Sequence, residues 1–241
     1  MDGREYIETT LNFAAPHLRG FRAPGGYTSQ HDRPPKGAGG GPTKVTVYNA
    51  RLLDPPPTLD SHGFQLMTHP PVTLDLLDMD VVKGEYYEEC RRLIKEATGC
   101  DEVRGGSNEF RRPPGLPTPN GSGGGFASGI HSDMSPGIEL GWEPGQDDRH
   151  FQSINVWRSA EGPEHNIEMM PLCLCAMDTV AEDDVVYGDG QNTGDVRQYY
   201  KLVDERCVHS PQQRWYYFPN MTPAETLLFR QYDTREEAPV K

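Results

Sequence analysis

A histidine and an aspartate separated by one residue, His131-Ser132-Asp133, form the pattern in this sequence that could best hold a metal ion. In an extended strand, residues i and i+2 point to the same side, so the two side chains could reach one ion together. A neutral imidazole and a carboxylate suit ferrous iron, and a second histidine would complete a facial triad with open coordination positions. The triplet alone carries little weight, because 8 histidines and 18 aspartates in 241 residues produce about 0.6 such triplets by chance.

Composition narrows the class of protein. The chain has 241 residues, enough for one globular domain with a core, and its formal net charge is -13. This charge argues against a nucleic-acid partner, because such proteins need a basic face, and it disfavours binding to anionic membrane surfaces. No run approaches the length of a membrane-spanning segment. Five cysteines without a Cys-x-x-Cys pair predict reduced thiols and a cytoplasmic protein.

Two stretches rich in glycine and proline are predicted to be flexible, because they bury too little apolar surface to offset the entropy of ordering. They are an N-terminal segment, residues 1–43, and a loop, residues 113–125. The remainder, residues 44–241, is predicted to form a single domain that contains this loop. No oligomeric state follows from these patterns.

The apolar pattern predicts one helix followed mostly by strands. Residues 80–99 carry apolar side chains near helical spacing, with Asp80 as the N-cap and Gly99 as the C-terminal stop. Residues 151–159 alternate in polarity, which predicts a strand. Strands and helices do not alternate along the chain, and this order argues against a doubly wound nucleotide-binding fold. We therefore predict a mainly β fold with a flanking helix, built as a jelly-roll or a distorted barrel.

Longer blocks of sequence surround the triplet. They are residues 58–99, "GIHSDMSP", "INVWRS", "PLCLCAMDTV" and "RWYYFPNMTPAETLLFRQYD". Together, from Lys44 onwards, they resemble the CmcJ/AsaB family of hydroxylases and desaturases, which includes gibberellin desaturases. The resemblance implies an oxidoreductase of secondary metabolism with a double-stranded β-helix core, which is a cupin-like jelly-roll. It also implies non-haem Fe(II) as the metal, 2-oxoglutarate as the co-substrate and a small metabolite as the substrate.

The resemblance also suggests roles for individual residues. His131 and Asp133 fall on the histidine and aspartate metal ligands of the family. Asn155, Trp157 and Arg158 fall on its N-x-W-R strand, which the resemblance places at the pocket wall or in contact with the co-substrate.

The C-terminal end departs from the family pattern. Family members continue past "QYD" with a histidine and then an arginine, which would complete the triad and bind 2-oxoglutarate, whereas "TREEAPVK" follows here. Three interpretations are open. The chain is a C-terminally truncated product; or His209 replaces the third ligand, with Arg214 as the carboxylate clamp because an arginine fork suits a carboxylate; or the chain binds without turnover.

The expected function is therefore that of an Fe(II)/2-oxoglutarate-dependent oxidoreductase that hydroxylates or desaturates a small metabolite. The alternative is a catalytically inactive family member that acts as a metabolite-binding protein, because the C-terminal histidine and arginine are missing. A third hypothesis is a metal-dependent cupin-like enzyme that works without 2-oxoglutarate.

Overall fold

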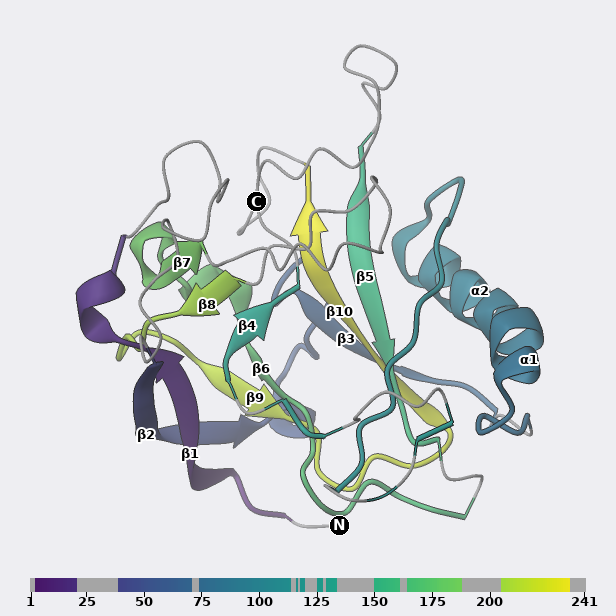
Figure 1. Ribbon diagram of the computed structural model, residues 1–241, viewed down its shortest axis with the longest axis horizontal. Coiled ribbons are helices and arrows are strands. Elements are labelled where there is room, and N and C mark those ends of the chain that lie inside the picture. Colours follow the sequence, from purple (N-terminus) through teal and green to yellow (C-terminus); the bar gives the residue numbers. More distant parts are fainter. Residues whose placement is uncertain are drawn as a thin grey trace.

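Ten strands in three sheets form the framework of the described residues in this computed structural model (Figure 1). The structure describes residues 3–20, 39–70, 74–113, 116, 118–119, 125–127, 129–133, 150–160, 164–187 and 205–234. The first sheet has the order β1 (Tyr6–Ala14), β2 (Gly39–Asn49), β9 (Trp215–Tyr217) and β6 (Cys173–Cys175). The second has the order β3 (Phe64–Thr68), β10 (Glu225–Asp233) and β5 (Gln152–Trp157). The third has the order β4 (His131–Ser132), β8 (Glu205–Cys207) and β7 (Val185–Tyr187).

The described part of the chain is mainly β with one flanking helical segment, as the sequence predicts. That segment consists of α1 (Met79–Val81), a π-helical turn (Val82–Tyr86) and α2 (Tyr87–Thr98). None of the described helices is long and apolar enough to cross a membrane. Short 3₁₀ turns occur at Pro16–Leu18, Ala50–Leu52, Met177–Thr179 and Glu182–Asp184.

The two ends of the helical segment test the predicted caps. Gly99 adopts a left-handed conformation with φ 68°, so the predicted C-terminal stop is confirmed. The predicted N-cap is wrong, because Asp78 rather than Asp80 caps the helix. The Asp78 carboxylate accepts hydrogen bonds from the backbone N–H groups of Asp80 and Val81, at 2.9 and 3.4 Å. The helix therefore begins two residues earlier than the apolar pattern indicates.

Helix α2 packs against one face of the β3–β10–β5 sheet (Figure 1). Leu93 of α2, 1% exposed, lies in a cluster with Met67 of β3 and Leu228 of β10. The opposite face of this sheet packs against the first sheet, because Phe64 and Leu227 share a cluster with Tyr216 of β9. Strand β10 is therefore covered on both faces.

The N-terminal segment differs from its prediction as a flexible region. Residues 6–14 form strand β1, which pairs antiparallel with β2 along its whole length. The reason is the alternation of Ile7, Leu11 and Phe13, which place their side chains against a cluster that contains Val47 and Trp215. Residues 21–38 of this segment, and much of the predicted loop at 113–125, lie outside the described residues.

An ion pair fixes the start of β10. Both guanidinium Nη atoms of Arg51 donate to the carboxylate of Glu225, at 2.7 and 2.8 Å, and the backbone N–H of Thr222 donates to the same carboxylate at 2.8 Å. Burial raises the pKa of Glu225, but the hydrogen bonds from Arg51 and Thr222 outweigh it and hold that pKa below its usual range.

Glu225→Gln is expected to lower the free energy of unfolding at pH 7 by about 1.5–3 kcal/mol, because it removes hydrogen bonds to a charged group. Because the folded pKa of Glu225 lies below the unfolded one, this stabilisation is present above the unfolded pKa and is lost as the pH falls through the folded pKa. Urea unfolding of both proteins at pH 7 and below about pH 4 measures this. A difference between the proteins that did not shrink at low pH would contradict the assignment.

Candidate metal centre

His131 and Asp133 lie on a short segment held by hydrogen bonds on both sides. Strand β4 pairs antiparallel with β8, with His131 opposite Arg206. Just before it, the backbone N–H of Ile130 donates to the carbonyl of Asn12 in β1, at 2.9 Å. The segment is therefore extended, and the predicted i, i+2 arrangement puts both side chains on one side.

The His131 ring is oriented by the backbone. Its Nδ1 lies 2.8 Å from the carbonyl oxygen of Gly129, and because a carbonyl only accepts, Nδ1 carries the hydrogen. In the neutral imidazole, Nε2 then presents its lone pair, and it lies 3.6 Å from Oδ1 of Asp133. The two side chains are 25% and 47% exposed, which leaves them open to an incoming ion.

This pair fits a divalent cation. Two electron-rich atoms, an imidazole nitrogen and a carboxylate oxygen, face each other, and the Nδ1–H to carbonyl bond is the second contact typical of a metal-ligating histidine. The donor set suits iron, zinc or copper better than magnesium or calcium, which prefer oxygen ligands alone.

Asp133 is held by two strands of the second sheet. Its Oδ2 accepts a hydrogen bond from Nδ2 of Asn155 in β5, at 3.2 Å. Its backbone N–H donates to the side-chain oxygen of Gln231 in β10 at 3.0 Å, and the Ser132 hydroxyl donates to the same oxygen at 2.6 Å. Oδ2 is thus engaged by Asn155, while Oδ1 faces His131.

The structure does not bring His209 to this pair. Its ring packs edge-on against Phe13 with 5.0 Å between centroids, and its carbonyl accepts a hydrogen bond from Arg19 at 2.8 Å. In the portion of the chain that the structure describes, no group of three histidine, cysteine, aspartate or glutamate side chains is close enough to hold a metal ion. The described residues therefore offer two candidate protein ligands, His131 and Asp133.

Of the three residues predicted on the N-x-W-R strand, one contacts Asp133 and the other two make contacts elsewhere. Asn155 contacts Asp133 directly, and Trp157, on the same face of β5, packs against the core cluster between the sheets. Arg158 points to the α2 side, where it donates to Glu89 at 3.4 Å and to the carbonyl of Pro223 at 2.7 Å. It therefore anchors α2 to the sheet.

Arg214 is exposed and directly precedes β9. Its backbone N–H donates to the hydroxyl of Thr179 at 3.0 Å, and its carbonyl accepts from the backbone N–H of Ala176 at 2.9 Å. These backbone contacts fix the entry into β9, and within the described residues they do not reach His131 or Asp133.

Gln231 is a residue of the candidate site that the sequence patterns do not indicate. It lies at a register shift in β10, between Arg230 and Tyr232, so that its side chain reaches the segment of His131 and Asp133. A glutamine in an apolar strand carries no signal of such an irregularity.

Comparison with known proteins identifies the family and several relatives of this chain. Residues 11–241 match a family model described as an oxidoreductase/YMDC permease-like domain. The hydroxylase/desaturase efuI of Hormonema carpetanum is 30% identical over 216 residues, covering 79% of this chain and 72% of that protein. The alpha-ketoglutarate-dependent dioxygenase phiK of Fungal sp. (strain ATCC 74256) is 27% identical over 188 residues, covering 72% of this chain and 65% of that protein.

Similarity extends to a solved structure. The iron and alpha-ketoglutarate-dependent endoperoxidase NvfI superimposes with a TM-score of 0.76 at 22% identity, covering 99% of this chain and 88% of that one. At this identity the likeness shows the fold. In sequence, the Fe(II)/2-oxoglutarate-dependent dioxygenase nvfI of Aspergillus novofumigatus (strain IBT 16806) is 26% identical over 208 residues, covering 80% of this chain and 71% of that protein.

Asn155→Ala is expected to weaken binding of a divalent metal such as Co(II) by about 10–100-fold, because the Asp133 carboxylate loses the hydrogen bond that orients it. Titration followed by the Co(II) absorption bands measures this. Ser153→Ala, on the same face of β5 but without a contact to Asp133, is the matched control and should bind like the unmodified chain. Equal affinities for all three proteins would contradict the role of Asn155.

Proposed function

The chain belongs to the CmcJ/AsaB hydroxylase/desaturase family, and we propose that it hydroxylates or desaturates a small metabolite. It is an oxidoreductase that uses Fe(II) and 2-oxoglutarate. The relative nvfI is named for both, and phiK is named for alpha-ketoglutarate. The observation that carries the proposal is the approach of His131 Nε2 to Asp133 Oδ1, at 3.6 Å, on one short segment that begins with β4.

The architecture supports a double-stranded β-helix core. The second sheet packs face to face against β9 of the first, and strand β4, which contains His131, lies between β8 and β10 (Figure 1). The likeness to the NvfI structure supports the same core.

The chain's own residues have defined tasks in this function. His131 would hold the metal through Nε2 and Asp133 would hold it through Oδ1, while Asn155 keeps Oδ2 in place. Bound Fe(II) supplies the activation of dioxygen, for which 2-oxoglutarate provides electrons. The described cysteines are all free thiols, which fits a reducing cytoplasmic compartment.

The test is an anaerobic Fe(II) titration combined with measurement of succinate formed from 2-oxoglutarate in air. The chain is expected to bind the metal and to release succinate. His131→Ala should weaken binding by more than about a hundredfold, because it removes a ligand rather than a residue that supports one. His165→Ala, which alters an exposed histidine, is the control and should change neither quantity.

Three outcomes would contradict parts of the proposal. No metal binding together with no succinate would refute the oxygenase function. Metal binding without succinate, even with candidate metabolites added, would favour the catalytically inactive metabolite-binding protein. Substrate oxidation without added 2-oxoglutarate would favour a cupin-like metalloenzyme.

A further inference from the structure

Strand β10 contains one extra residue where it pairs with β5. Arg230 lies opposite Ile154 and Tyr232 lies opposite Ser153, so Gln231 has no partner of its own in the ladder. This is a β-bulge, an irregularity that redirects side chains and is common next to active sites.

The bulge places Arg230 and Asp233 on the same face. In a regular strand, residues three apart point to opposite faces, but here Arg230 is opposite Ile154 and Asp233 is opposite Gln152, which share a face of β5. Nη1 of Arg230 donates to Oδ2 of Asp233 at 2.6 Å, and both side chains are 0% exposed. The ion pair can form only while the extra residue stays looped out of the ladder.

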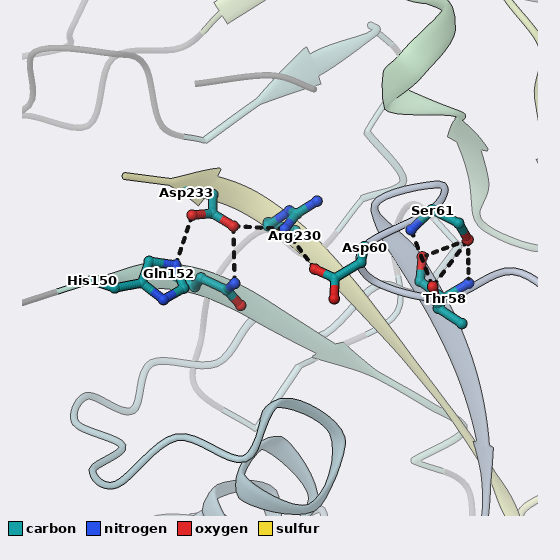
Figure 2. Close-up of polar contacts among 7 residues, drawn as sticks. All are labelled: Thr58, Asp60, Ser61, His150, Gln152, Arg230 and Asp233. Carbon is teal, nitrogen blue, oxygen red and sulfur yellow. Dashed lines mark hydrogen bonds and ion pairs between the residues drawn. The ribbon is translucent and has the colours of Figure 1, made fainter. Parts of the chain in front are cut away.

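A network of polar groups closes around this ion pair on the α2 side of the sheet (Figure 2). Oδ1 of Asp233 lies 2.7 Å from Nε2 of His150, and Oδ2 accepts a hydrogen bond from Gln152 at 2.9 Å. Asp60, in the turn before β3, approaches the same Nη1 of Arg230 at 3.6 Å. Each acidic oxygen of Asp233 therefore has at least one partner, and the pair joins β10 to β5 and to the turn.

The other product of the bulge is the position of Gln231. Its side chain reaches the segment of residues 131–133, where its oxygen accepts hydrogen bonds from the Ser132 hydroxyl and from the Asp133 backbone N–H. One irregularity in β10 thus forms a buried ion pair on one face of the sheet and a support for Asp133 on the other.

We propose that Arg230 and Asp233 are positioning residues for Asp133. Their buried ion pair holds the bulge in β10, and the bulge holds the Gln231 side chain against the backbone of Asp133. The consequence for metal binding rests on the proposed function of His131 and Asp133. The effect of the ion pair on the position of Asp133 does not require a metal.

The first measurement is amide hydrogen exchange of Asp133, followed by NMR in the metal-free full chain. Gln231→Met removes the acceptor at similar size and should accelerate exchange about tenfold, as loss of one hydrogen bond predicts. Gln231→Glu keeps an acceptor oxygen and should retain the protection. This pair of variants calibrates the signal from the Gln231 contact.

The decisive variant removes the ion pair on the opposite face. The double substitution Arg230→Met with Asp233→Asn leaves no unpaired buried charge, so it avoids the main cause of misfolding in single variants. It should accelerate exchange of the Asp133 amide about as much as Gln231→Met does. Combining it with Gln231→Met should add little, because both changes act through one contact.

Arg51→Met with Glu225→Gln is the matched control. It removes the ion pair at the other end of β10, where the register is regular, and should leave Asp133 exchange unchanged although it destabilises the chain. Arg230→Lys is the conservative variant. Nε and Nη2 of Arg230 are buried without a hydrogen-bond partner in the described structure, so a single ammonium can replace Nη1 and should preserve protection.

Co(II) titration of the same variants gives the second measurement. The Arg230→Met/Asp233→Asn variant should bind about tenfold more weakly than the unmodified chain, and the Arg51→Met/Glu225→Gln control should bind equally well. If the unmodified chain bound no metal, the proposed function would fail. Amide exchange would still show whether the Arg230–Asp233 ion pair holds Asp133 in place. Unchanged exchange of the Asp133 amide in the Arg230→Met/Asp233→Asn variant would overturn the inference.

Discussion

The pairing of β10 with β3 on one side and with β5 on the other is the interaction on which the rest of the structure depends. Because α2 covers one face of this sheet and the first sheet covers the other, side chains of β10 are buried in both directions. A strand buried on both faces cannot slide in register without exposing one apolar set and burying the wrong groups. The position of β10 is therefore well defined, and so are the positions of the residues that hydrogen-bond to its side chains.

Polar groups in such a strand are costly unless they are paired, and their positions show where the structure uses them. Glu225 at the start of β10 and Asp233 at its end are both buried and each binds an arginine. Between them, Leu227 and Leu228 are apolar and fill the two clusters. The charged residues thus lie at the two ends of the strand, where their ion pairs join it to neighbouring loops. The apolar residues pack the middle of the strand into the core.

The sequence predicts those parts of the molecule that depend on local pattern. The helix ending at Gly99, the alternation of the strand containing Asn155 and the shared side of His131 and Asp133 all follow from spacing along a few residues. Register does not. The unpaired Gln231 depends on how β10 meets β5, and no alternation within β10 marks where the extra residue falls.

The same distinction explains the residues whose placement differs from expectation. Arg158 and Asn155 are neighbours in one motif, yet a strand sends residues three apart to opposite faces, so only Asn155 reaches Asp133. His209 follows a strand that pairs with β4, but its ring turns to Phe13. In both cases the motif defines the segment correctly, whereas the face of the sheet decides which side chain contacts the site.

The negative charge of the chain gives a reason why the candidate site pairs one carboxylate with a neutral imidazole. The protein carries a formal net charge of -13, which repels an anionic co-substrate such as 2-oxoglutarate at long range. The described guanidinium groups of Arg51, Arg158 and Arg230 are each engaged with carboxylates that join elements of the fold. One neutral imidazole and one carboxylate would neutralise only part of the charge of a divalent cation, so a site built from His131 and Asp133 would keep a net positive charge when occupied. A second carboxylate in place of His131 would cancel that charge and remove the local attraction for the dianion.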